Sequence, residues 1–198
     1  MNRKLSIGLA TVVAAALTLT VAAPASANGG SKPSGSIVDV AVSASGGGTP
    51  DGNGRDYDLL VQALVATGLD ATLADTSTQY TVFAPTDQAF MRLVTDLTGA
   101  APASEAAALT TITSTFSAEQ ISNILLYHVV PGKKLGPLQV LLSRNLTMAN
   151  GGTIQPRATT LRDETPSLKD PRLVLWAINI QATNGVIHTI DRVLVPAG

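Results

Sequence analysis

The chain has 198 residues, of which 45% are hydrophobic and 14% are charged, and it has no cysteine. Its 13 basic and 14 acidic residues give a formal net charge of −1, so a protein that binds a nucleic-acid backbone is not expected. The lack of cysteine excludes a disulfide framework, a thiolate metal site and a redox CxxC pair, and the apolar content is too high for a disordered chain.

The first 27 residues predict an export signal. Arg3 and Lys4 precede an apolar stretch over residues 5–23, and residues 25–27, Ala-Ser-Ala, have the small-x-small pattern that signal peptidase cleaves. A retained membrane anchor is the alternative, because the stretch approaches the length needed to cross a bilayer. A helix-breaking proline and the lack of basic residues after the stretch favour cleavage after Ala27.

Residues 28–35 form a flexible linker with nothing to bury, and residues 36–197 have a suitable size for one domain with one core. Apolar spacing and capping residues predict helices through the first half of this domain. In chain order we expect a helix from the cap Ser36 to Ala44, a Gly-rich loop over 46–54, and a helix capped by Asp56 and ended by Gly68. A turn over 70–75 and a strand over 80–83 follow. The next elements are a helix from Thr86 to Gly99, a helix over 103–112, and a helix that begins with a Ser117–Gln120 capping box.

The second half predicts strands, because its segments are rich in β-branched residues and separated by Gly, Asn or Pro. The expected strands are 146–149, 153–158, 172–182 and 186–195, and Asn184-Gly185 is a hairpin signal between the last two. Helices first and antiparallel strands later indicate an α+β domain.

The loop that starts at Asp51 resembles a calcium-binding loop only superficially. An EF-hand loop needs an oxygen ligand at position 5, glycine at position 6 and a bidentate glutamate at position 12. Here those positions hold Arg55, Asp56 and Gln62. We therefore expect a solvated loop that ends in a helix cap, and no metal site.

The sequence contains two histidines, His128 and His188, and neither lies in a recognised catalytic motif. His128 falls on the apolar stripe of its predicted helix, where a hydrogen-bonded core histidine is the common outcome. His188 lies in a predicted strand and is expected to be structural as well. No catalytic residue and no cofactor are predicted.

Three segments in order along the chain resemble the signatures of the fasciclin (FAS1) domain family. The first is residues 80–90, Tyr-Thr-Val-Phe-Ala-Pro-Thr-Asp-Gln-Ala-Phe. The second is residues 125–132, Leu-Leu-Tyr-His-Val-Val-Pro-Gly, and the third is residues 184–196, which begin Asn-Gly-Val-Ile-His-Thr-Ile-Asp. The similarity covers about residues 36–197.

This resemblance implies the family's fold, a wedge of two antiparallel β-sheets flanked by a helical layer. We expect Thr86 to cap the next helix, Asp87 to favour that helix's N-terminus, and His128 to be hydrogen-bonded against it. Gly185 should permit a tight turn, and Pro196 should end the last strand. The signature residues with an expected structural role are Phe83, Pro85, Thr86, Asp87, Phe90, Tyr127, His128, Pro131, Gly132, Gly185, His188, Asp191 and Pro196.

The resemblance also implies a secreted, non-enzymatic module for adhesion or for contact with the extracellular matrix or cell surface. Its partner would be a surface or matrix protein or a glycan, and we expect a monomer with no stable membrane insertion after processing. The alternative is a secreted protein that binds a lipid or glycan in an apolar cleft between helices and sheet. A hydrolase is the third hypothesis.

Two segments are candidates for interaction. The polar stretch 154–172, which contains Arg157 and Arg162, departs from the family pattern and is either an extended hairpin or an exposed loop. Asn179-Ile180 occupies the place of an Asp-Ile pair that is implicated in integrin contact in some animal fasciclin domains. An amide offers a cation only a neutral carbonyl oxygen, whereas a carboxylate carries a full negative charge. We therefore expect no cation-dependent integrin adhesion through this pair.

Export is directly testable. Intact-mass analysis of the secreted protein should give a chain that starts at Asn28, and Ala27→Leu should block cleavage because signal peptidase needs a small residue there. Recovery of the unprocessed wild-type chain from the membrane fraction would contradict both the processing and the location.

Overall fold

The computed structural model describes residues 33–197, so the predicted export signal and most of the predicted linker lie outside the described residues. Within this range, no helix is both long enough and apolar enough to cross a membrane.

Helices dominate the first half of the described chain and strands the second half. The helices are α1 (Ile37–Ala44), α2 (Asp58–Thr67), α3 (Leu69–Ala74), α4 (Asp87–Thr98), α5 (Glu105–Thr115), α6 (Ala118–Leu126), α7 (Pro137–Leu142) and the short 3₁₀ helix η1 (Leu175–Ala177). The strands are β1 (Tyr80–Pro85), β2 (Val129–Pro131), β3 (Leu146–Thr147), β4 (Thr153–Arg157), β5 (Thr160–Arg162), β6 (Ile180–Ala182) and β7 (Gly185–Ile190).

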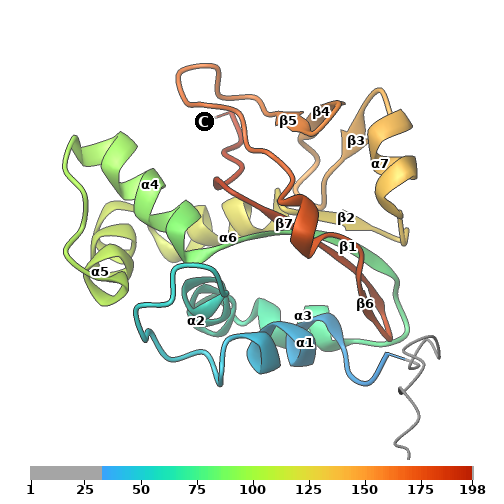
Figure 1. Cartoon of the computed structure of the whole chain (residues 1–198), viewed down its shortest axis with the longest axis horizontal. Helices are drawn as coiled ribbons and strands as arrows, with labels where there is room; N and C mark the ends of the chain where they lie inside the picture. The colour runs from blue at the N-terminus through green and yellow to red at the C-terminus, as the bar shows by residue number, and fades with distance from the viewer. Residues whose placement is uncertain (1–32, 198) are drawn as a thin grey trace, which may run out of the picture. The chain divides into compact units, whose positions relative to one another are not determined.

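The strands form two sheets, and the predicted α+β class is confirmed. One sheet has the order β2-β1-β7-β6, and the other has the order β3-β4-β5 (Figure 1). The larger sheet is mixed rather than wholly antiparallel, because β1 and β7 pair in parallel with Phe83 opposite His188. The smaller sheet is antiparallel.

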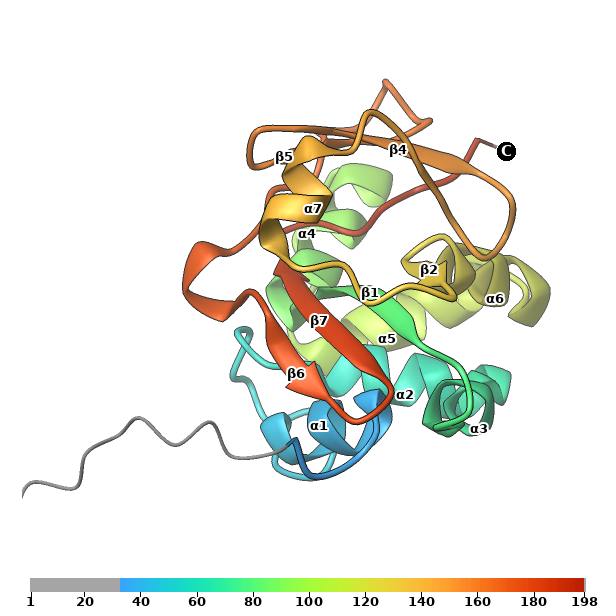
Figure 2. The ribbon, with the colours of Figure 1, turned by 90° about the vertical axis from the view of Figure 1, so that its right-hand side faces the viewer.

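The larger sheet is covered on both faces, with helices α1, α2 and α3 on one side and α7 with the smaller sheet on the other (Figures 1 and 2). Every residue of β1 and β7 is buried. Along β1, Tyr80, Val82 and Ala84 join the core under the helices, whereas Phe83 joins the core on the opposite face. Burying one such apolar side chain typically contributes about 1.5–3 kcal/mol. Side chains from these helices and from the sheet therefore pack together in one core.

Several boundaries differ from the sequence prediction. Residues 70–75, predicted as a turn, lie mostly in α3, which starts where Gly68 in the left-handed conformation ends α2. The predicted strand 172–182 is interrupted by η1, and only its end forms β6. Strand β2 and helix α7 are not predicted from the sequence, because both are too short to show a periodicity.

His128 lies just beyond α6 and is bonded to main-chain atoms at both ring nitrogens. Its Nδ1 donates to the Ile124 carbonyl over 2.7 Å, and its Nε2 accepts from the Leu194 N–H over 2.9 Å. The expected bond to the start of α4 at Thr86 and Asp87 is not formed, because the ring points to these two main-chain partners instead. Burial lowers the pKa of His128 to about 4, so the ring is neutral at pH 7.

Several other signature residues have structural roles. The Tyr127 hydroxyl donates to the Thr153 carbonyl over 2.7 Å, Phe90 is a core residue of α4, and Pro85 and Pro131 are the last residues of β1 and β2. Asp191 accepts a bond of 2.7 Å from the N–H of Arg172.

The two signature glycines have different roles. Gly132 follows β2 with a φ of +71°, a conformation that favours glycine. Gly185 has no positive φ; a Cβ there would collide with the Tyr80 carbonyl, so close backbone approach rather than turn geometry requires it. Pro196 does not end a strand either, because β7 already ends at Ile190.

Removing the His128 ring should be costly. His128→Ala leaves the Leu194 N–H and the Ile124 carbonyl without partners in the core, and each buried unpaired group typically costs about 1–3 kcal/mol. We expect the free energy of unfolding at pH 7 to fall by about 2–4 kcal/mol in urea titrations. The exposed Lys133→Ala should change it by less than about 0.5 kcal/mol. Equal stability of the two variants would contradict the assignment.

The same ring should make the fold sensitive to acid. The folded-state pKa of His128 lies near 4, below the ordinary value of 6.5, so the unfolded chain binds the proton more readily between these two pH values. The wild type should therefore lose about 3 kcal/mol more than His128→Gln as the pH falls from 6.5 to 4. Subtracting the two urea profiles removes the contribution of the carboxyl groups. Parallel profiles would show that His128 is not buried as a neutral ring.

Candidate functional site

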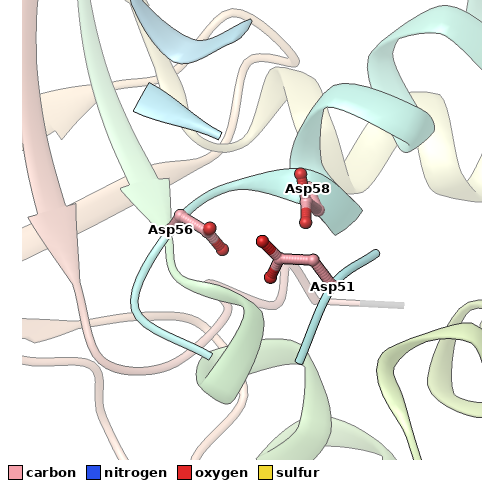
Figure 3. A group of neighbouring side chains, drawn as sticks. All are labelled: Asp51, Asp56 and Asp58. Atoms are coloured by element: carbon pink, nitrogen blue, oxygen red, sulfur yellow. The ribbon is translucent and has the colours of Figure 1, made fainter. Parts of the chain in front are cut away.

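Five carboxyl groups gather where the loop before α2 meets the first turns of α4 and α5. They form two overlapping groups whose ligand oxygens lie within 4.8 Å of one another: Asp51, Asp56 and Asp58, and Asp58, Asp87 and Glu105. Figure 3 shows the carboxylates of Asp51, Asp56 and Asp58 converging on one small space. We refer to these five residues as the acidic cluster.

Three of these residues hold equivalent places in their helices. Asp58, Asp87 and Glu105 are the first residues of α2, α4 and α5. The N-terminus of a helix carries partial positive charge from its free N–H groups, so an acidic residue is favourable there. The fold thus brings three helix N-termini, each with its own carboxylate, to one place.

Asp87 and Glu105 are engaged with the main chain. Asp87 accepts bonds from the N–H groups of Asp58 (3.1 Å) and Leu59 (2.8 Å), so it caps α2 rather than its own helix. Glu105 Oε2 accepts from the N–H groups of Asp51 (3.1 Å) and Gly52 (2.9 Å). Glu105 thus holds the start of the loop at Asp51 and Gly52, and Asp87 holds its end at Asp58 and Leu59.

Of the two caps predicted at this place, Asp56 is wrong and Thr86 is confirmed in position only. Tyr57, not Asp56, is the N-cap residue of α2, and it makes no capping bond with its side chain. Thr86 is the N-cap residue of α4, but its hydroxyl makes no capping bond. The carboxylate of Asp87 already accepts hydrogen bonds from the N–H groups at the start of α2, so these N–H groups do not need Asp56 as a cap.

Asp56 and Asp58 are buried, which a solvated loop would not require. Asp58 is 0% exposed and Asp56 is 6% exposed. Asp56 Oδ2 accepts from the Asn53 side chain over 2.8 Å. Within residues 33–197, Asp56 Oδ1 and both carboxylate oxygens of Asp58 have no hydrogen-bond donor. Buried polar atoms without partners are uncommon in folded proteins.

Crowding of negative charge changes the protonation of the cluster. Burial, together with the charges of Asp56, Asp51 and Glu105, raises the pKa of Asp58 to about 6. Burial and the adjacent Asp56 carboxyl also raise the pKa of Asp87. The ion pairs formed among the described residues, Arg92–Asp191 and Arg192–Asp96, do not involve the cluster. Its charge is therefore not compensated by a basic side chain.

A second feature is an exposed aromatic residue beside an open groove. Trp176 and Leu175, both on η1, are 72% and 63% exposed. The groove is lined by the apolar residues Ala44, Tyr57, Trp176, Ala177, Ile178 and Ile180 and by the polar residues Asn53, Arg55 and Asp56. We refer to these residues as the Trp176 groove.

Asn179 and Ile180 lie on one edge of this region, but Asn179 is not in a strand as predicted. It has a φ of +61°, its N–H donates to His188 Nδ1 over 3.2 Å, and its Oδ1 accepts from the Gln181 side chain over 2.8 Å. Asparagine tolerates this left-handed conformation better than most residues. Ile180 packs against the core and lines the Trp176 groove.

Arg157 and Arg162 come together elsewhere. They lie at exposed positions on β4 and β5, which pair as a hairpin, so the hairpin alternative holds for residues 153–162. Both line a hollow together with Asp163 and Asp170. The mixed charges there do not single out a partner of one sign.

Neither histidine is arranged for catalysis. His188 is buried, its Nε2 donates to the Leu135 carbonyl over 2.8 Å, and its Nδ1 accepts from Asn179. Both ring nitrogens of His128 are similarly occupied. A general base needs a free ring nitrogen directed at the group it deprotonates.

The sequence does not point to Glu105 or Trp176 as site residues, and it places Asp87 only at the start of its own helix. Asp87 and Glu105 join the acidic cluster from helices that are distant in sequence from the loop, and only their places at helix starts gave a signal. Trp176 was included in a predicted strand. The sequence offers no clear signal for its exposure, because its neighbours in residues 173–178 are all apolar.

Comparisons with known proteins agree with the fold. A family profile described as the Fasciclin domain matches residues 55–196. The chain is 27% identical over 140 residues to Protein sll1483 of Synechocystis sp., covering 71% of this chain and 67% of that protein. It is 34% identical over 126 residues to the immunogenic protein MPB70 of Mycobacterium bovis and to MPT70 of Mycobacterium tuberculosis, covering 63% of this chain and 54% of each relative.

The chain thus spans about half the length of the mycobacterial relatives that it matches. Among solved structures it is similar to a FAS1 domain pair from the insect cell adhesion molecule fasciclin I, with a TM-score of 0.59 and 17% identity over 82% of this chain and 51% of that one. At that identity the likeness shows the fold. The profile match, however, covers more than half of the sequence and includes all three signatures. The chain therefore belongs to the Fasciclin domain family.

Proposed function

We propose that this chain is an exported, non-enzymatic module for adhesion or cell-surface contact, and that the Trp176 groove is its contact surface. Family membership supports the adhesion role, because a structural relative is described as a cell adhesion molecule. The predicted export signal supports a location outside the cell. The observation that carries the choice of surface is the exposure of Trp176.

An exposed tryptophan beside another exposed apolar side chain is costly to leave in water. Trp176 and Leu175 are adjacent on η1 and extend from a short helical turn that main-chain bonds tie to the central sheet, including one from the N–H of Val174 to the Thr189 carbonyl over 2.8 Å. Tryptophan is enriched among residues that dominate binding energy at protein interfaces. Because the backbone of η1 is held by these bonds, less conformational entropy is lost when a partner covers Trp176.

The polar residues of the groove add directionality. Asn53 and Arg55 line it together with the apolar residues, so a partner that fills the groove and covers Trp176 also meets an amide and a guanidinium. This combination suits a surface protein or a glycan, since an aromatic ring packs against the apolar face of either and the polar groups fix its orientation.

The alternative function is binding of a small secreted ligand. The groove has a volume of about 720 Å³, within the range of about 300–1,000 Å³ typical of small-molecule sites. Its mostly apolar lining with a few polar groups is also typical of such sites. It lies at the surface, bordered by Ala44 at the end of α1 and by Ile180 on the edge strand β6.

Loss of Trp176 should remove binding. We expect the purified mature protein to bind members of an array of matrix proteins and glycans, and Trp176→Ala to weaken that binding at least tenfold. Leu138→Ala is the matched control, because Leu138 is 73% exposed on α7 and does not line the groove. Binding that is equal in Trp176→Ala and wild type would exclude this surface.

A thermal-shift screen separates the two functions. A lipid or soluble glycan at about 100 times its Kd stabilises the folded state by about 2.7 kcal/mol and should raise Tm clearly. Such a shift, lost in Trp176→Ala, would favour the small-ligand function. Attachment to matrix proteins without any shift from small ligands would favour adhesion.

A further inference from the structure

The side chain of Asp58 presents an electrostatic problem that the protein atoms around it do not solve. It is 0% exposed, and both carboxylate oxygens lack a donor within residues 33–197. A buried carboxylate without partners is strongly unfavourable. A proton would neutralise it but would add an O–H donor and leave the second oxygen unpaired. A bound cation would satisfy both oxygens at once.

We propose that Asp51, Asp56 and Asp58 form a binding site for a calcium ion. Their ligand oxygens lie within 4.8 Å of one another and point into one space (Figure 3). Calcium binds oxygen at about 2.3–2.6 Å, so two of its ligands are at most about 5 Å apart. Magnesium demands near-ideal octahedral geometry at about 2.0–2.1 Å and is usually bound through only one or two carboxylates, so three carboxylates on one loop suit calcium better.

Each of the three residues has a carboxylate oxygen that accepts no hydrogen bond within residues 33–197 and can coordinate the ion. Asp51 Oδ1 accepts from the Asn53 N–H over 2.8 Å, whereas its Oδ2 accepts no hydrogen bond within residues 33–197. Asp56 Oδ1 and both oxygens of Asp58 have no donor there either. Asp51 is exposed, so an ion reaches the site from solvent on its side. Water completes the six to eight oxygen ligands that calcium takes.

The residues behind the site hold its ligands in place. Glu105 binds the N–H groups of Asp51 and Gly52, and Asp87 binds the N–H groups of Asp58 and Leu59. The loop is thus anchored at both of its ligand-bearing ends before any ion arrives, which lowers the entropy lost on binding. Both anchors are acidic residues, so they add to the negative potential that attracts a divalent cation.

This site differs from an EF-hand, whose spacing the sequence does not match. Its three ligands come at positions 51, 56 and 58, two of them are buried, and Asp58 lies beside the first residues of α4 and α5, Asp87 and Glu105. The mismatch at Arg55 and Gln62 therefore excludes an EF-hand but not a calcium site of another construction.

The test uses the mature protein freed of metal with EDTA and then dialysed. Calorimetric titration with calcium chloride should show one site with a Kd of about 10⁻⁴–10⁻³ M, the range of extracellular calcium modules. Calcium at 10 mM should raise Tm by about 5 °C, and magnesium at 10 mM should raise it much less. A wild type that neither gives heat nor shifts Tm with calcium would overturn the proposal.

Variants assign the ligands. Asp58→Asn keeps the shape and removes the charge, so it should fold without calcium at least as stably as the wild type and lose calcium affinity at least tenfold. Asp70→Asn, the same change on α3 outside the cluster, should bind calcium as the wild type does. Should Asp58→Asn fail to fold, the exposed Asp51→Asn should still lose affinity at least fivefold. Unchanged calcium binding in either acidic-cluster variant would place the ion elsewhere and refute the site.

Discussion

Two strands that are far apart in the sequence, β1 and β7, pair in parallel at the centre of the larger sheet. The positions of the other elements depend on this pair, because they either pack on it or follow it directly in the chain. Neither face of these two strands is exposed to water, so each polar side chain on them needs a hydrogen-bond partner inside the protein. Thr81 bonds main-chain atoms of Lys133 and Leu135, and His188 bonds Leu135. The central pair therefore holds the segment before α7 through side chains rather than through strand pairing.

The same pair sets the position of the acidic cluster. β1 ends at Pro85, and Asp87 follows at the start of α4, where its N–H bonds the Asp56 carbonyl over 3.1 Å and its carboxylate caps α2. The end of a buried strand thus serves as the anchor for a loop that comes from a distant part of the chain. One consequence is that the first family signature, which looks like a strand-and-cap motif in sequence, also builds the wall of a charged site.

The sequence predicted the fold class and most helices well because their signals are local. The predicted cap at Ser36 and the predicted capping box at Ser117 both form, and Gly68 and Gly99 end their helices in the left-handed conformation. Local signals could not show that the larger sheet is mixed, since the direction of a strand partner is set by the path of the whole chain. They also could not show that Asp87 caps another helix.

The candidate sites were less predictable for the same physical reason. The loop 51–58 does not match the ligand spacing of an EF-hand, and the buried carboxylate of Asp58 lies beside the first residues of α4 and α5, which come close only in the folded chain. Trp176 carries β-forming character in sequence, yet η1 turns it outward. In both cases the deciding quantity is exposure, which a single sequence does not report.

The acidic cluster and the Trp176 groove share part of one loop, and this connects the two proposals. Asp56 belongs to the cluster and lines the groove, and the Asn53 side chain, which also lines the groove, donates to Asp56 Oδ2. An ion held by Asp51, Asp56 and Asp58 would draw these carboxylates together and fix the Asn53 amide through that bond. The polar wall of the groove would then be ordered before a partner arrives. Calcium outside the cell would in this way act on affinity by organising the contact surface, without touching the partner itself.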